Sequence, residues 1–337
     1  MAPYLGELLS ESVAEHIGAT PLVRLRRLPT SLNIKAKICA KLEFFNAGGS
    51  VKDRIAKRML ERAEQDGLIK PGDTLIEASS GNTGIAIALM AAVKGYKCII
   101  VLSEKMSLEK EQILHALGAI VVRTPAGVPI ESDDSILSVA KRLHKDTPNS
   151  WILDQYNNPE NPRAHEYGTA EEVWHQTKGQ LDILVAGAGT GGTITGLTRG
   201  LKKKCRNVTV IGVDPIGSVL AHPAELNEQK SEYKVEGIGY DFVPGVLDQI
   251  APDTWIKTSD RDAFHFARRL VREEGILCGG SSGAVFAGLL NYLSTHPEGN
   301  VEDKTIVLIF PDSLRNYLTK FGDDSWMESN GFTGDTD

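Results

Sequence analysis

The sequence contains little cysteine. Its 337 residues include only four, Cys39, Cys98, Cys205 and Cys278, which lie far apart and form no C-x-x-C pair. This excludes the spacing of a disulfide framework or a zinc site and is typical of reduced thiols in a cytoplasmic protein. The eight histidines also lack the spacing of metal ligands, so we expect no metal ion.

Long apolar runs and an excess of positive charge are missing as well. No run approaches the roughly 20 apolar residues of a membrane-spanning helix, and the N-terminus lacks the pattern of a secretory signal. The net charge is −7 and the pI about 5.7, which argues against a nucleic-acid or anionic-membrane partner. The length instead allows about two globular domains with a sizeable core.

Short apolar, β-branched runs alternate with amphipathic segments along most of the chain. Strands are expected at 38–42, 74–77, 98–102, 120–123, 183–186, 208–213 and 305–310. Helices are expected at 53–66, 85–94, 107–117, 134–144, 162–176, 192–203, 260–273 and 283–294. Continuous apolar strands flanked by helices are typical of parallel strands buried on both faces, which predicts an α/β fold. The acidic tail, 326–337, is expected to pack poorly.

Polar, glycine-rich turns follow several strands, at the edge of a parallel sheet where ligands bind. Residues 187–193 read GAGTGGT and open a helix, so backbone amides, threonine hydroxyls and the helix dipole predict a phosphate-binding loop. Residues 79–84, SSGNTG, offer more side-chain donors and suit a small carboxylate. A Rossmann dinucleotide site is an alternative for the first loop, because Asp214 ends the next strand where a ribose-binding acid would lie.

Residues 46–54, NAGGSVKDR, place a lysine at the start of a helix behind two glycines. Ser50 and Asp53 have the spacing of a capping box, with Ser50 as N-cap. Lys52 then lies in the first turn, where the helix dipole disfavours a second positive charge. We expect a lowered pKa for Lys52, as carbonyl chemistry requires. The alternative is a surface lysine beside an ordinary helix start.

Taken together, these segments resemble the fold-type II pyridoxal-phosphate (PLP) enzymes of the cysteine synthase/cystathionine β-synthase family. The resemblance runs from about Ile17 to Tyr317, and its most specific parts are 41–54, 79–84, 104–107, 153–156, 189–196 and 236–242. Cysteine synthases usually lack the tyrosine and aspartate found here at Tyr240 and Asp241, so the chain is more similar to the β-synthase branch.

The resemblance implies two doubly wound parallel-sheet domains with the cofactor in the cleft between them. The larger, PLP-binding domain would comprise 1–45 plus 155–325. The smaller, mobile substrate-binding domain would comprise 46–154. Relatives are homodimers, so a homodimer is expected.

The resemblance also implies residue roles. Lys52 would be the catalytic residue and would bond covalently to the cofactor aldehyde. Asn82 would form a hydrogen bond to the ring 3′-oxygen, and Ser281 would face the pyridine nitrogen. The phosphate would be held by Gly189, Thr190, Gly191, Gly192 and Thr193. The substrate carboxylate would be bound by Ser79, Ser80, Thr83 and Gln155. The side of the second substrate would be lined by Tyr156, Glu236, Gly239 and Tyr240.

The implied activity is that of a PLP-dependent carbon–oxygen lyase. It would condense L-serine with L-homocysteine to L-cystathionine through an aminoacrylate intermediate, with side reactions that release hydrogen sulfide. Mammalian relatives bind haem through a cysteine and a histidine in an N-terminal extension. The 16 residues before Ile17 contain no cysteine, so no haem is expected. The chain also has no length for the tandem regulatory module of relatives, so control by S-adenosylmethionine is expected to be absent.

Three alternatives remain. A cysteine synthase would use O-acetylserine and sulfide on the same scaffold. A nicotinamide-dependent dehydrogenase would use the loop 187–193 and Asp214, but it leaves Lys52, Asn82 and Ser281 without roles. A catalytically silent binding module would be expected to have lost one of these three residues, and all are present.

Overall fold

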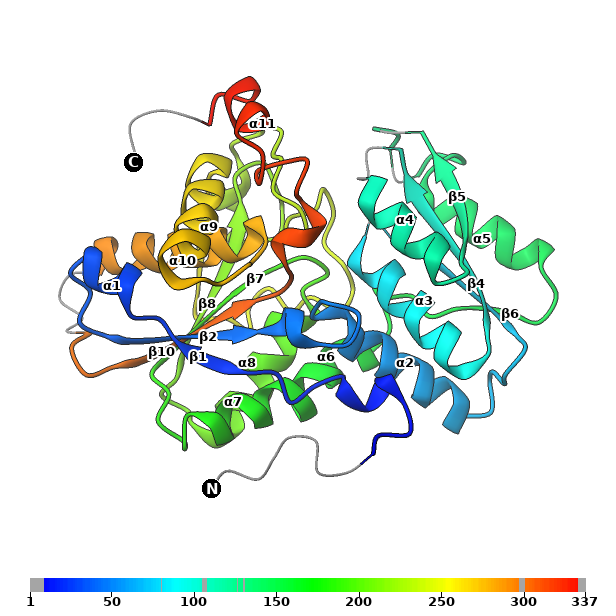
Figure 1. Ribbon diagram of the computed structural model, residues 1–337, viewed down its shortest axis with the longest axis horizontal. Coiled ribbons are helices and arrows are strands. Elements are labelled where there is room, and N and C mark those ends of the chain that lie inside the picture. The colour runs from blue at the N-terminus through cyan, green and yellow to red at the C-terminus, as the bar shows by residue number, and fades with distance from the viewer. Residues whose placement is uncertain are drawn as a thin grey trace.

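Two separate β-sheets organise the chain in the computed structural model (Figure 1). The structure describes residues 9–79, 81–104, 108–125, 127–129, 131–296 and 301–332. The larger sheet contains, in spatial order, β1 (Leu22–Arg24), β2 (Lys37–Leu42), β10 (Thr305–Phe310), β7 (Ile183–Gly187), β8 (Thr209–Pro215) and β9 (Thr254–Thr258). The smaller sheet contains β5 (Ile120–Thr124), β4 (Lys97–Ser103), β3 (Thr74–Ala78) and β6 (Ser150–Ile152).

Neighbouring strands are parallel in both sheets except at one edge, where β1 runs antiparallel to β2. The expected α/β class is therefore confirmed, and each expected strand is found within about two residues of its position. The pattern did not predict β1, β6 and β9. The first two have only three residues each, and β9 is only partly buried, so none carries a continuous apolar run.

Helices connect the strands of each sheet. The longer ones are α2 (Lys52–Gln65), α3 (Asn82–Lys94), α4 (Leu108–Ala116), α5 (Ile136–Asp146), α8 (Gly192–Lys204), α9 (Asp260–Glu274) and α10 (Gly280–Thr295). Short elements are α1 (Arg27–Ser31), α11 (Asp324–Ser329) and the turns η1 (Val13–His16), η2 (Glu43–Phe45), η4 (Ala224–Asn227) and η5 (Leu314–Asn316). The expected helix at 162–176 is instead α6 (Glu160–Ala164), a π-helical turn η3 (His165–Thr169) and α7 (Ala170–Gln176).

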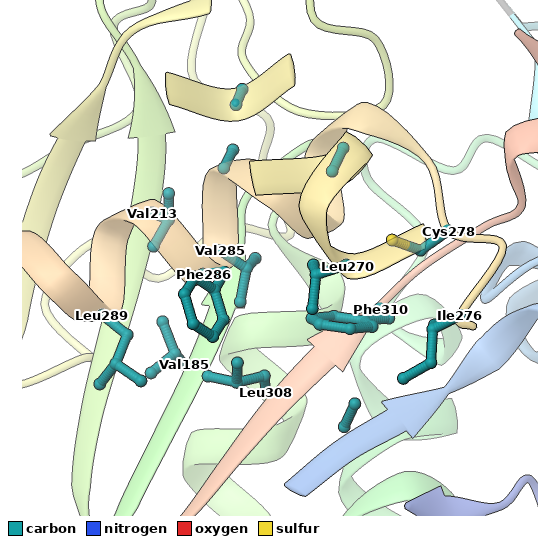
Figure 2. Packing of buried hydrophobic residues seen from close by; sticks show 14 of the residues in the cluster. Val185, Val213, Leu270, Ile276, Cys278, Val285, Phe286, Leu289, Leu308 and Phe310 are labelled. Carbon is teal, nitrogen blue, oxygen red and sulfur yellow. The ribbon is translucent and has the colours of Figure 1, made fainter. Parts of the chain in front are cut away.

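Both faces of the larger sheet are buried. Figure 2 shows one face, where Phe286 and Leu289 of α10 lie over Val185 of β7. The alternate residues of β7, Leu184 and Ala186, belong to the apolar cluster on the opposite face. Because successive side chains of a strand point to opposite faces, this double coverage explains the continuous apolar run of β7.

The C-terminal segment packs more closely than expected. Met327 is buried, and the Trp326 ring lies edge-on to Phe264 with centroids 5.4 Å apart. Phe332 contacts the same Phe264 ring at 5.2 Å. The expectation of a poorly packed tail is therefore wrong for 326–332, because its apolar side chains complete a core. Residues 333–337 lie outside the described part.

Among the described residues, no helix is both long enough and apolar enough to cross a membrane.

Leu289→Ala should lower the free energy of unfolding by about 2–5 kcal/mol, because the side chain is fully buried and its loss leaves a cavity. The matched control is Leu318→Ala, since Leu318 is 57% exposed and its truncation should change stability by less than about 0.5 kcal/mol. Chemical denaturation followed by circular dichroism measures both. Equal effects would contradict the assignment of Leu289 to the core.

Candidate active site

A cavity of about 640 Å³ lies between the two sheets. Its walls come from both, with Lys52, Asn82, Thr83 and Gln155 on one side and the loops at 189–190 and 232–241 on the other. A smaller cavity of about 30 Å³ shares Lys52, Asn82 and Gly189 with the first and adds Thr193, Ser281 and Asp312. Turns after β3, β7 and β10 meet here, as expected for the carboxyl ends of parallel strands.

Lys52 is the first residue of α2, but the helix start differs from the expected capping box. The Ser50 hydroxyl accepts from the amide of Lys52 at 3.2 Å, and the Asp53 carboxylate accepts from the amide of Gly48 at 2.6 Å. Ser50 thus bonds a first-turn amide as an N-cap does, but Asp53 reaches back to Gly48 rather than to Ser50, so the expected capping box is only partly formed. Ser50 pairs with Asp312 in an isolated β-bridge, which keeps the backbone out of the helix.

The pKa of Lys52 is lowered to about 8, mainly by burial and against the opposing charge of Asp312. The expected direction is confirmed, although burial rather than the helix dipole is the main cause. An amine with this pKa is partly neutral near pH 8 and can act as a nucleophile or base.

A buried ionic network anchors the start of α2. Arg54 donates to both carboxylate oxygens of Glu43, at 2.6 and 2.9 Å, and to Glu172 of α7 at 2.6 Å. Lys41 of β2 donates to the same Glu172 at 2.6 Å. Burial would raise the pKa of Glu172, but Arg54 and Lys41 lower it to about 2. These contacts fix the backbone two residues away from Lys52.

The loop between β7 and α8 has close backbone contacts that require glycine. A Cβ atom at Gly189 would lie 2.6 Å from the carbonyl oxygen of Gly237. Gly191 has a φ of +86°, and a Cβ there would lie 2.5 Å from Leu247. The Thr190 hydroxyl accepts from the Asn161 amide at 3.1 Å. The loop therefore brings Gly189, Thr190, Gly191, Gly192 and Thr193 together at a helix N-terminus that faces the cavities, as an anionic group requires.

Residues expected at the substrate carboxylate also come together. The Thr83 hydroxyl donates to the Gln155 side chain at 2.7 Å, and Ser79 accepts from the Gly84 amide at 2.9 Å. Glu77 accepts from the backbone amide of Gln155 at 3.1 Å and holds this loop against β3. Ser80 lies outside the described residues.

Asn82 and Ser281 lie at the small cavity, beside a carboxylate that the sequence reasoning missed. The Asn82 amide donates to Asp312 at 2.7 Å, and the Tyr317 hydroxyl donates to the same oxygen at 2.5 Å. Within the described part of the chain, the buried Ser281 hydroxyl has no hydrogen-bond partner. Asp312 follows β10 directly, and a polar residue just after a predicted parallel strand was the sequence signal by which it could have been predicted.

This set of groups fits pyridoxal phosphate. The unpartnered Ser281 hydroxyl can serve a ring nitrogen, the Lys52 amine can bond to an aldehyde, and the loop after β7 can hold a phosphate. The dinucleotide alternative fits less well. Asp214 is fully buried and accepts from Lys257 at 2.7 Å, so its carboxylate is not presented to a ribose.

An aromatic cluster lies at the far side of the larger cavity. The hydroxyls of Tyr156 and Tyr240 are 3.2 Å apart, and Phe242 contacts both rings. Tyr240 lines the cavity with Gly239, whereas the buried Tyr156 lies behind Tyr240. The structure therefore gives Tyr156 a supporting position, which differs from the expected lining position.

Glu236 connects the two sheets across the cavity. It accepts from Lys110 of α4 at 2.5 Å and also from Lys320, and the two lysines lower its pKa although burial opposes them. A second contact between the same regions is the Thr319 hydroxyl, which donates to Glu109 at 2.7 Å. Lys110 is buried and was not singled out from the sequence, because its partner is 126 positions away.

Comparison with known proteins agrees with a site for pyridoxal phosphate. The chain is 54% identical over 321 residues to a cystathionine beta-synthase of Rattus norvegicus, covering 95% of this chain and 56% of that protein. It is 51% identical over 331 residues to the Saccharomyces cerevisiae protein of the same name, covering 96% of this chain and 65% of the relative. The chain thus spans little more than half the length of the rat relative.

Solved structures of the same fold include two bacterial enzymes. A hydrogen sulfide-producing enzyme from Fusobacterium nucleatum has a TM-score of 0.84 and 36% identity, covering 92% of this chain and 100% of that one. An O-acetylserine dependent cystathionine beta-synthase from Helicobacter pylori has a TM-score of 0.84 and 35% identity, covering 93% and 98%. The family model described as pyridoxal-phosphate dependent enzyme matches residues 13–312. The chain belongs to the family of pyridoxal-phosphate dependent enzymes.

Proposed function

We propose that the chain is a PLP-dependent lyase that condenses L-serine with L-homocysteine to give L-cystathionine. The observation that carries the proposal is the Lys52 amine, which has a lowered pKa and lies where the small cavity joins the large one. The names of the rat and yeast relatives support the choice of substrates.

The small cavity, together with the adjoining part of the larger one, is the proposed cofactor site. Gly189, Thr190, Gly191, Gly192 and Thr193 would hold the phosphate, Asn82 the 3′-oxygen and Ser281 the ring nitrogen. When bound, PLP delocalises the negative charge that develops at the substrate Cα. Ser281 is a neutral partner for the ring, which favours elimination over transamination because it need not keep the pyridine protonated.

The chain's own residues bind the amino acid and move its protons. Ser79, Thr83 and Gln155, with Ser80, would bind the serine carboxylate and orient its Cα–H toward Lys52. The neutral Nζ of Lys52 would take that proton and then protonate the departing β-hydroxyl. Glu236, Gly239 and Tyr240, with Tyr156 behind Tyr240, would form the side from which the homocysteine thiol reaches the β-carbon.

Two related reactions belong to the same proposal. The Helicobacter relative is described as an O-acetylserine dependent cystathionine beta-synthase, which supports O-acetylserine as an alternative to serine. The pair of O-acetylserine and sulfide remains the alternative from the sequence resemblance. The Fusobacterium relative is described as hydrogen sulfide-producing, which supports a side reaction that releases sulfide. Both reactions require only a different leaving group or thiol in the same cavity.

We also propose that 46–154 form a smaller, mobile domain and that 1–45 plus 155–325 form the larger one. Separate apolar clusters around the two sheets support this division. Closure over the substrate carboxylate would exclude water from the reacting atoms. A homodimer in the cytoplasm remains part of the proposal from the sequence resemblance, and light scattering of the purified protein tests the dimer.

Lys52→Ala should reduce turnover by about 10²-fold to 10⁴-fold, because it removes the proposed base and the amine that bonds to PLP. After borohydride reduction and tryptic digestion, mass spectrometry should find a pyridoxyl adduct on Lys52 of the unmodified protein. Lys70→Ala, at an exposed lysine beyond the same helix, should keep both the adduct and the turnover. Unchanged turnover in Lys52→Ala would contradict the proposed mechanism.

Steady-state product analysis should show faster formation of cystathionine from serine and homocysteine than of cysteine from O-acetylserine and sulfide. The physical reason is the side of the cavity lined by Tyr240 and Glu236, which leaves room for a thiol larger than sulfide. Sulfide release from cysteine with homocysteine should be detectable in the same preparation. A dominant rate with O-acetylserine and sulfide would instead identify a cysteine synthase.

Lys110→Met should raise KM for serine by about tenfold, equivalent to about 1.4 kcal/mol, with a smaller change in kcat. The reason is loss of the contact between α4 and Glu236, which weakens closure over the substrate. Hydrogen exchange of 108–116 should become faster. Lys202→Met is the control, because Lys202 pairs with Asp253 within the larger sheet region. Unchanged KM and exchange would argue against a closing contact.

A further inference from the structure

The π-helical turn η3 packs against α8, the helix that begins in the proposed phosphate loop. Such turns are rare and occur often at functional sites. Its contact with α8 is close, since a Cβ atom at Gly196 would lie 2.1 Å from the carbonyl oxygen of Pro162 and 2.8 Å from the Cβ of His165. The first residue of the turn, His165, is therefore held rigidly against the helix that begins at Gly192.

Both ring nitrogens of His165 have hydroxyl partners. Nδ1 lies 2.9 Å from Oγ1 of Thr169, and Nε2 lies 3.2 Å from Oγ1 of Thr193. The ring is 1% exposed. Burial, together with the nearby charges of Arg54 and Lys52, lowers the pKa of His165 well below its usual value. The ring is therefore neutral, with one nitrogen as donor and the other as acceptor.

The partner of Nδ1 determines which nitrogen carries the proton. Thr169 is fully buried, and within the described part of the chain Nδ1 of His165 is the hydrogen-bond partner of its hydroxyl. An unused hydroxyl donor would cost about 1–3 kcal/mol at this buried position. The Thr169 proton therefore points to Nδ1, and Nε2 carries the ring proton and donates to Thr193.

This arrangement directs the hydroxyl of Thr193. Because Oγ1 accepts from Nε2, its own proton is free to point elsewhere, and Thr193 lines the small cavity. A hydroxyl that donates to an anion forms a stronger hydrogen bond than one between neutral groups. The opposite tautomer would make Nε2 an acceptor and turn the Thr193 proton away from the cavity.

We propose that His165 is a positioning residue for the cofactor phosphate: held as the Nε2–H tautomer by Thr169, it directs the Thr193 hydroxyl to donate into the phosphate site. The inference rests on the proposed role of Thr193 in the loop that holds the phosphate. His165 itself does not touch the reacting atoms.

The test compares the affinity of the apoenzyme for PLP with its affinity for pyridoxal, which lacks the phosphate. His165→Phe should weaken PLP binding by about tenfold or more and leave the affinity for pyridoxal unchanged. His165→Gln, which keeps a donor, should recover most of the PLP affinity. His175→Phe is the matched control at an exposed position on α7 and should change neither affinity. Equal loss for both ligands would overturn the inference in favour of a general packing role.

Two further measurements separate this inference from the proposed function. Thr193→Val alone should weaken PLP binding; if it does not, the phosphate assignment itself fails. In the Thr193→Val background, His165→Phe should not weaken PLP binding further. An additive loss of affinity would contradict the proposal that His165 acts through the Thr193 hydroxyl. Nitrogen-15 chemical shifts of His165 in the holoenzyme should report the Nε2–H tautomer. The Nδ1–H tautomer would overturn it.

If His165→Phe does not fold, Thr169→Val provides the decisive variant, because it removes only the hydroxyl that fixes the tautomer. It should weaken PLP binding about threefold to tenfold, again without an effect on pyridoxal. An unchanged PLP affinity of Thr169→Val would contradict the proposal that Thr169 fixes the tautomer of His165.

Discussion

The position of Lys52 depends on the buried ionic network that begins two residues further along α2. Arg54 joins Glu43, which follows β2, to Glu172 of α7, so one guanidinium holds three elements together. Leaving one member of such a network buried without its partner costs about 3–5 kcal/mol. Arg54, Glu43 and Glu172 line neither of the two cavities of the site, so the network can fix the helix start without competing for a ligand.

The shape of the cavity depends on close backbone contacts that only glycine allows. Gly189 admits the backbone of Gly237, and Gly191 lies against Leu247 in a left-handed conformation. These glycines let the loop after β7 curve tightly enough to aim its amides and hydroxyls inward. The larger sheet therefore supplies the site for an anion, whereas Thr83, at the start of α3, and Gln155, after β6, lie on the side of the smaller sheet and contact each other.

Features with a local signal could be predicted from the sequence. The α/β class, the seven apolar strands and the glycine loops follow from periodicity and from residue types at strand ends. The lowered pKa of Lys52 was predicted for a local reason, although its main cause is burial. The missed features depend on distant partners. Asp312 matters because Asn82 and Tyr317 donate to it, and Asn82 lies 230 positions away in the sequence. The ordered 326–332 segment depends on Phe264, far away in α9.

The π-helical turn has a consequence for the angular register of the helices around it. Each residue of an α-helix advances the side chains by about 100°. Removing one residue within 165–169 to restore a regular helix would therefore rotate all of α7 relative to α6. Glu172 would then turn away from Arg54 and Lys41, leaving two buried cations without their shared carboxylate. The π-helical turn thus sets the rotation of α7 relative to α6. This rotation allows the side chains of both helices to make their contacts at the same time.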